Sequence, residues 1–454
     1  MHNLQQGVIY LASFIVLVGV MVVVHEFGHF AVAKFFKVRV ESFSVGFGPR
    51  LFGVKFGETD YKICLLPLGG FVKMTGENPG EEQHLDDPAA FTSHPRWQRM
   101  LIGVAGPISN FILAFVVMVF YFGAINEVPD IKTATLEWVT AGSAAGQAGL
   151  QPGDIVRQFN STANPDWETF HNLVRENQRQ TVSLAVERDG KLVQTSLTLP
   201  DGLQGKDYDL SPAGLFVQYD SDPIGVEQVF PDTPAERAGL KAGDSILAVD
   251  GHAFHTVAPL LDYLKAGQGK PIALTVLRAG ATLPPLVAHP YQQDADWRLG
   301  FAPAQPADPA LKISRIPFST AVGRAGEFCA DNSQMILNVL KKLVTAKVSV
   351  KQLSGPLGIA VAAGQAAQAK YWYPKFGLAA GISLNLGILN LLPFPILDGG
   401  LILLLAIEGA LRRDISMMVK ERIYQAAFVV LIAFFAFVMF NDVTKLSIFS
   451  HLKP

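Results

Sequence analysis

The chain has 454 residues, of which 50% are hydrophobic and 17% are charged, and its formal net charge is −2. This composition is too apolar for an ordinary soluble enzyme and predicts several membrane spans joined to soluble parts. The near-neutral charge gives no general reason to expect nucleic-acid binding. The two cysteines, Cys64 and Cys329, do not suggest a disulfide scaffold.

A first membrane span is predicted within residues 1–33. Its apolar run, from Val8 to Val24, ends in the H-E-x-x-H pattern His25-Glu26-Phe27-Gly28-His29. No Lys or Arg precedes the run and no small-residue cleavage site follows it, so we interpret it as a retained span and not as a signal peptide. Helical residues four apart share a face, so His25 and His29 can hold one Zn²⁺ and Glu26 is placed as a general base.

The simpler interpretation of this motif is an interfacial His/Glu cluster that only ends a helix. Ionisable residues at the end of a membrane-length apolar run are costly, however, unless they have a function. The location therefore favours a metal site over an accidental cluster.

Residues 34–99 are predicted to form a β-rich segment and a loop on the cytoplasmic side. Alternating polar and apolar residues, punctuated by glycines, indicate short strands joined by tight turns up to Lys73. Such a sheet can enter a bilayer only where protein or water shields its backbone. The polar stretch from Glu77 to Pro95 is predicted to be a surface loop.

The second span is predicted at residues 100–125. It carries Asn110, a polar residue in an apolar run. Asn110 could form a hydrogen bond between helices, or it could act near a metal or substrate. The sequence leaves both roles open.

Residues 126 to about 310 lose the long apolar runs and contain an internal repeat. The stretch Ala148–Val156 recurs as Ala238–Leu247 with the shared pattern A-G-L-x-x-G-D. This pattern closely resembles the PDZ signature in its circularly permuted bacterial arrangement. The resemblance implies two α/β PDZ domains, at 127–220 and 221–309, with candidate peptide-carboxylate loops that contain Gly214 and Leu215 in the first and Gly300 and Phe301 in the second.

PDZ domains bind an extended peptide at a sheet edge. The pair could instead be a spacer that binds no chain terminus. A size filter against bulky substrates is compatible with either possibility.

Residues 311–375 are predicted to form an amphipathic region on the membrane surface, because helical spacing there gives a cationic face. The third span, 376–408, contains the motif N-x-x-P-x-P-x-L-D-G from Asn390 to Gly399. Its prolines should unwind or kink a helix. Asp398 is the best candidate for a third metal ligand, because two His and one carboxylate leave an open position for water. Asn385 and Asn390 could present amides to a substrate or could bridge helices.

A cytoplasmic loop at 409–422 and a fourth span at 423–443 complete the chain. Residues 34–99 hold nine Lys or Arg, at positions 34, 37, 39, 50, 55, 62, 73, 96 and 99. The positive-inside rule therefore places both termini and the PDZ pair outside the cytoplasmic membrane, with the metal site near the cytoplasmic leaflet. In this topology the two cysteines lie on opposite sides of the membrane.

The three features together, namely H-E-F-G-H, N-x-x-P-x-P-x-L-D-G and the PDZ pair between the second and third spans, resemble the site-2 protease family of intramembrane zinc metalloproteases. The resemblance covers nearly the whole chain and extends to the bacterial members with two PDZ domains. It implies His25, His29 and Asp398 as ligands of one Zn²⁺ and Glu26 as general base. It also implies that Asn390 and Asn385 handle substrate and that Val45, Gly46, Phe47 and Gly48 contact an unwound substrate strand. Relatives often follow L-D-G-G with a polar or basic residue, whereas Leu401 follows here.

The resemblance further implies a multi-pass protein of the bacterial cytoplasmic membrane that acts in regulated intramembrane proteolysis and the stress response. Its substrate would be a single-pass membrane protein, such as an anti-sigma factor already cut by a site-1 protease, or a remnant signal peptide. A non-enzymatic PDZ scaffold is one alternative, but a scaffold needs neither H-E-x-x-H nor L-D-G. An ion or metal transporter is another, made less attractive by only four spans and a large insertion.

Overall fold

The computed structural model describes residues 2–77, 87–203, 209–218, 222–293, 296–304, 310–345 and 355–445. The chain forms two compact units. The helical unit combines the N-terminal part up to Asn126 with the C-terminal part from Arg315, and the inserted unit is Glu127–Ser314.

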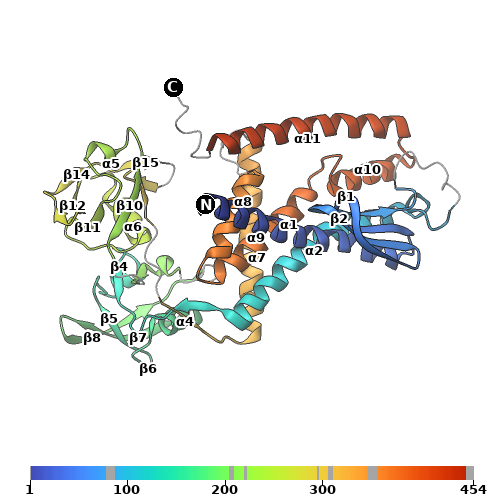
Figure 1. The fold of residues 1–454 in the computed structure, drawn as a ribbon. Helices are drawn as coiled ribbons and strands as arrows, with labels where there is room; N and C mark the ends of the chain where they lie inside the picture. Colours follow the sequence, from blue (N-terminus) through green and yellow to red (C-terminus); the bar gives the residue numbers. More distant parts are fainter. Residues whose placement is uncertain are drawn as a thin grey trace. The chain divides into compact units, whose positions relative to one another are not determined.

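The helical unit is built around two long helices that run side by side, α1 (His2–Phe35) and α2 (Arg96–Phe120) (Figure 1). Helix α9 (Tyr373–Asn390) packs on α2, and α7 (Phe318–Val344) packs on both. Helix α8 (Pro356–Gln368) packs on α1. The two C-terminal helices are α10 (Asp398–Leu411) and α11 (Met417–Lys445).

Within the described chain, three stretches are helical, long and apolar enough to cross a membrane: Gln5–Phe35, Arg96–Ile125 and Met418–Asp442. They coincide with the first, second and fourth predicted spans. The third predicted span is interrupted where its prolines were expected to unwind or kink it, because α9 ends at Asn390 and α10 begins only at Asp398. Pro393 and Pro395 lie in this break, and proline removes a backbone donor and clashes with the preceding helical turn.

The loop predicted at 409–422 is also shorter than expected. Helix α10 continues to Leu411 and α11 begins at Met417, so residues 412–416 alone connect them. Of the basic residues that suggested a loop, Arg412 and Arg413 lie in this connection, and Lys420 and Arg422 lie in the first two turns of α11.

The segment after α1 is one long β-ribbon and not the series of short strands that its glycines suggested. Strands β1 (Val40–Phe56) and β2 (Thr59–Met74) pair antiparallel, with register shifts between Val40 and Phe52. Residues 42–45 pair both with 70–73 and with 60–63, so the ribbon folds back on itself beyond Gly46. Side chains of β1 alternate between buried and half-buried up to Gly46, and from Phe47 onward they are exposed. Of the predicted loop that follows, residues 78–86 lie outside the described part.

The inserted unit contains two modules, each with its own sheet, helix and core. In the first module the sheet has the order β6-β5-β7-β8, and β4 pairs with β9. Its elements are β4 (Leu136–Val139), α3 (Ala144–Gln147), β5 (Ile155–Phe159), β6 (Thr162–Ala163), α4 (Trp167–Glu176), β7 (Thr181–Arg188), β8 (Lys191–Thr198) and β9 (Leu215–Val217).

The second module has the strand order β13-β12-β11-β10-β17, with β14 paired to β12. Its elements are β10 (Ile224–Val229), α5 (Pro234–Arg237), β11 (Ser245–Val249), α6 (Val257–Gly267), β12 (Ile272–Arg278), β13 (Ala281–Thr282), β14 (Leu286–Ala288), β15 (Tyr291–Gln293), β16 (Asp296–Arg298) and β17 (Phe301–Pro303). The short strands β3 (Glu127–Pro129) and β18 (Leu311–Ile313) pair where the unit begins and ends.

The sequence repeat has a matching structural repeat. In the first module Arg188 donates from Nε and Nη2 to both carboxylate oxygens of Asp154, each at 2.7 Å, and from Nη2 to the carbonyl of Gly149. In the second module Arg278 makes the same three bonds, to Asp244 and to the carbonyl of Gly239. The Asp of each A-G-L-x-x-G-D copy is therefore a buried anchor for an arginine at the end of a strand.

Candidate active site

Helix α1 positions three of the predicted site residues. It continues through the H-E-x-x-H motif to Phe35, so His25 and His29 stand one turn apart on one face. Both rings are buried, with 7% and 9% of their surface exposed, and their Nε2 atoms lie 3.3 Å apart.

The third predicted ligand, Asp398, reaches the histidines from the first residue of α10. Its Oδ2 lies 3.1 Å from His25 Nε2, and its Oδ1 lies 3.5 Å from His29 Nε2. One ligand atom from each of the three residues lies within 4.8 Å of the others. The structure thus brings together the three residues that the sequence proposed as ligands.

The donor set fits a zinc ion. Two imidazole nitrogens and a carboxylate are typical of catalytic zinc, which keeps a further position open. Asp398 Oδ2 is buried without a hydrogen-bond partner among the described residues. Such an orphaned acceptor, facing two imidazole nitrogens, is the pattern expected where a cation belongs.

The backbone of α2 orients His29. Its Nδ1 lies 2.7 Å from the carbonyl oxygen of Ile102, which can only accept a hydrogen bond. The proton therefore sits on Nδ1, and the lone pair of Nε2 is directed at Asp398 and His25.

His25 is oriented by Asn110, a residue whose role the sequence left open. Asn110 is fully buried on α2, and its side-chain amide lies 3.1 Å from His25 Nδ1. The oxygen and nitrogen of an amide are assigned from the hydrogen-bond network. With its oxygen toward His25, Asn110 accepts the Nδ1 proton, and Nε2 is left free to bind metal. The polar residue within an apolar run was the signal that pointed to it.

Glycine allows α2 to approach the site. A β-carbon on Gly106 would overlap the ring of His29, and one on Gly28 would overlap the carbonyl of Ala105. The close contact of α1 with α2 therefore requires glycine at both positions.

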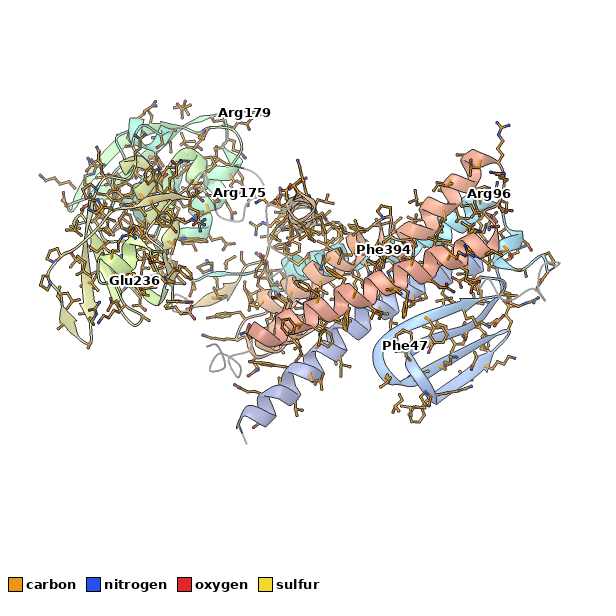
Figure 2. All side chains as sticks on the ribbon, turned by 90° about the horizontal axis from the view of Figure 1, so that it is seen from above. Phe47, Arg96, Arg175, Arg179, Glu236 and Phe394 are labelled. Carbon is orange, nitrogen blue, oxygen red and sulfur yellow. The ribbon has the colours of Figure 1, made fainter. Side chains whose placement is uncertain are left out.

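Glu26 faces the β-ribbon. A β-carbon built on Gly70 of β2 would stand 3.3 Å from Glu26 Cγ, and Gly70 pairs with Val45 of β1. The predicted Val45-Gly46-Phe47-Gly48 segment therefore begins beside the general-base candidate. Phe47 follows on the ribbon (Figure 2), where its ring stacks on Phe71 and is 44% exposed.

The two asparagines predicted to handle substrate differ in position. Asn390, the last residue of α9, has its amide nitrogen 3.4 Å from His25 Nε2. Asn385 is half-buried earlier on α9, and its side chain makes no hydrogen bond to another described residue. Phe394 lies in the break that follows Asn390 (Figure 2).

The predicted peptide loops belong to the inserted unit. In the first module the amides of Gly214 and Leu215 already donate to the carbonyls of Ser211 and Leu210, at 2.8 and 3.2 Å. In the second module Gly300 has φ +94° and precedes Phe301, the first residue of β17. The carbonyl of Gly300 accepts a hydrogen bond from Phe230 N at 3.0 Å.

Two histidines and a carboxylate around one point, with a glutamate beside them on a membrane-length helix, define a zinc metalloprotease site. The model of peptidase family M50 matches residues 13–434. A putative zinc metalloprotease of Vibrio cholerae is 34% identical over 96% of this chain and 98% of its own length. Regulator of sigma E protease of Salmonella typhi is 35% identical, and regulator of sigma-E protease RseP of Escherichia coli is 34% identical, over the same shares of both chains.

The chain therefore belongs to peptidase family M50, the site-2 proteases. This confirms the resemblance seen in the sequence and identifies a membrane zinc metalloprotease related to the RseP proteins. Membership of a peptidase family also favours the enzyme over the scaffold and the transporter.

Proposed function

We propose that the chain is an intramembrane endopeptidase that cleaves transmembrane segments of single-pass membrane proteins. The observation that carries this proposal is the convergence of His25, His29 and Asp398 beside Glu26 in a helical unit with membrane-length helices. These residues would hold one Zn²⁺, which when bound supplies Lewis acidity toward water and the scissile carbonyl.

Glu26 acts as the general base and then as the general acid. It takes a proton from the attacking water, whose oxygen bonds to the carbonyl carbon of the substrate. The C–N bond then breaks, and Glu26 returns the proton to the leaving amine. Asn390, whose amide lies at the site, supplies a hydrogen-bond donor for the charge that develops on the carbonyl oxygen.

A transmembrane helix hides its carbonyls in backbone hydrogen bonds, so the substrate must be unwound locally. The β-ribbon is suited to hold the unwound strand. Residues 42–45 of β1 pair on both sides, with 70–73 and with 60–63 of β2, so the free edges of the ribbon are residues 70–74 of β2 and 52–56 of β1. A free edge can accept an added strand. Gly70, on the first of these edges, lies beside Glu26, so an added strand would pass the general base there. Val45, the partner of Gly70, begins the segment to Gly48 that would contact this strand, and Asn385 on α9 would contact the far end of the strand.

The relatives named as regulators of sigma-E protease suggest the substrate class. We propose an anti-sigma factor already shortened by a site-1 protease, with remnant signal peptides as a second group. The site of action would be the bacterial inner membrane, with the inserted unit and both termini outside and the metal centre near the cytoplasmic leaflet. This arrangement follows from the nine Lys and Arg between residues 34 and 99.

We further propose that the two modules are PDZ domains that inspect or exclude what approaches. The matched anchors, Arg188 with Asp154 and Arg278 with Asp244, support a common fold for the pair. In the first loop the amides of Gly214 and Leu215 are engaged, which favours Gly300 and Phe301 of the second module as the peptide site.

The test is a cleavage assay on the purified protein in detergent, with a tagged single-pass helix that lacks its outer domain. The wild type, Glu26→Gln and the wild type with a zinc chelator would be compared. We expect cleavage within the apolar segment by the untreated wild type alone. Cleavage by Glu26→Gln at the wild-type rate would refute the mechanism. If the protein bound one zinc per chain but no sample showed cleavage, the proposed class of substrate would be refuted.

A further inference from the structure

A cavity of about 410 Å³ extends from the metal-site residue Asp398. Its wall combines apolar residues of α10 with charged residues from three other parts of the helical unit. The charged groups, besides Asp398, are Glu77 after β2, Arg99 on α2 and Lys420 on α11.

Arg99 is the unusual member of this wall. Its side chain is only 8% exposed, and its Nε is buried without a hydrogen-bond partner among the described residues. The ring of Phe91 lies beside it, with the guanidinium carbon 6.0 Å from the ring centre. A buried guanidinium offers five donors in a fixed plane, and leaving them without an acceptor is costly.

Three acids near Arg99 have other partners, although Glu408 Oε2 has none among the described residues. Glu408, fully buried on α10, accepts hydrogen bonds from Lys420 Nζ at 2.6 Å and from Ile415 N at 3.0 Å. The carboxylate of Glu77 accepts a bond from Met74 N at 3.3 Å. Asp414 pairs at 2.8 Å with Arg96, which is the first residue of α2 (Figure 2). The cavity therefore presents an arginine whose fork is open to a ligand.

The chemistry at Asp398 identifies that ligand. Hydrolysis of a peptide bond there breaks the C–N bond and leaves a carboxylate on the fragment whose carbonyl was attacked. A carboxylate is the bidentate partner that a guanidinium fork fits best. Because Asp398 and Arg99 share one cavity, the new carboxylate can leave the metal site and meet Arg99 without crossing apolar protein.

We propose that Arg99, with Lys420 beside it, binds the newly formed C-terminal carboxylate of the cleaved fragment. The site draws the product away from the metal ligands and so clears them for the next substrate. This proposal rests on the proteolytic function given above.

The test uses the fragment recovered from the cleavage assay, synthesised with a free C-terminal carboxylate or with a C-terminal amide. Binding of each labelled peptide to the zinc-loaded protein is measured by fluorescence anisotropy. For the wild type we expect the carboxylate form to bind about 10-fold or more tightly than the amide form. In Arg99→Met the preference for the carboxylate form should fall to the small preference that the metal alone provides. Arg99→Lys should keep part of the wild-type preference.

The matched control is Arg96→Gln, which removes a cation one turn away on α2 that does not line the cavity. It should keep the wild-type preference, and zinc content measured for every variant shows that the fold is intact. Equal binding of the two peptides to a wild type that cleaves its substrate would overturn the proposal and leave the protease intact. A further peptide carries a C-terminal amide and one added internal Asp. If it bound as tightly as the carboxylate form and this binding depended on Arg99, the site would recognise acidic side chains of the substrate, and product binding would be overturned. Absence of cleavage by the wild type would count against the proposed function instead.

Discussion

At the scale of single residues, the two histidines are held by different partners on the same helix. His29 is oriented by the carbonyl of Ile102 and His25 by the amide of Asn110, and both partners belong to α2. The H-E-x-x-H spacing predicts a shared face from local helix geometry alone. It could not predict these partners, because they depend on how α2 packs against α1.

Gly106→Ala tests the closeness of this packing. The added methyl group would overlap the ring of His29 and push Nε2 out of the triad. We expect activity to fall about 100-fold, since a displacement near 1 Å at a reacting centre has that effect. Zinc content and cleavage rate would be measured together. Gly103→Ala is the control on the same helix, because its methyl group would meet Ile402 at an ordinary 3.5 Å, and it should retain both.

Asn110→Leu tests the orientation of His25. The substitution keeps the volume but removes the partner of Nδ1, so the ring loses its fixed tautomer. We expect zinc affinity to fall about 10- to 100-fold, as for other outer partners of metal-binding histidines. Competition with a calibrated chelator measures it, with Glu26→Gln as a variant that lacks activity yet should bind zinc normally. Unchanged affinity in Asn110→Leu would mean that helix packing alone orients His25.

At the scale of elements, the sequence predicted the chemistry of the third ligand better than its setting. Asp398 stood out because a carboxylate in an apolar stretch is costly. The prolines before it predicted a kink or an unwound turn, but not that α9 and α10 would be two separate helices. The break gives Asp398 the first position of a helix, from which its side chain reaches α1. The β-ribbon was likewise predicted as β-structure but not as two long strands, because the glycines inside β1 and β2 resemble turns between separate strands.

Gly400→Ala tests whether the tight turn before α10 holds Asp398 in place. A β-carbon at Gly400 would overlap the carbonyl of Phe394, so the helix start must move. We expect roughly a 10- to 100-fold loss of activity with reduced zinc content. On the same helix Gly409→Ala meets nothing within 4 Å and should behave as the wild type. Full zinc content in Gly400→Ala would show that the turn tolerates the shift.

The second module should show a pH-dependent stability that its arginine anchor explains. The hydrogen bonds from Arg278 lower the pKa of Asp244 below its usual value of 3.8. A carboxyl group with a lowered folded pKa contributes stability above its unfolded pKa, and that contribution disappears as the pH falls through the folded value. Asp244→Asn should therefore lower the unfolding temperature by several degrees at pH 7 and by progressively less below about pH 3.9.

Thermal unfolding of the inserted unit, followed by circular dichroism from pH 7 to pH 3, measures this difference. Asp232→Asn makes the same change at an exposed position of the module and should leave the unfolding temperature nearly unaltered. If the difference in unfolding temperature between the wild type and Asp244→Asn stayed constant down to pH 3, then the packing of Asp244, and not its ionisation, would account for its contribution to stability.

At the scale of the whole molecule, orientation in the membrane decides which compartment reaches the metal centre. The sequence predicts an orientation from charge counts near span ends, which the positive-inside rule uses independently of packing. It could not predict how the two units sit relative to each other, because no local pattern encodes a long connection between separately folded parts.

Cysteine labelling tests the orientation directly. The native thiols Cys64 and Cys329 would first be replaced by serine, and single cysteines placed at exposed positions, Lys191 in the inserted unit and Lys55 in the β-ribbon. An impermeant maleimide applied to intact spheroplasts should label Lys191→Cys and spare Lys55→Cys, whereas permeabilised cells should label both. The reverse pattern would place the ribbon and the metal centre at the outer face. Labelling from outside at Lys191→Cys alone would place the inserted unit and the β-ribbon on opposite sides of the membrane, as the proposed filter requires.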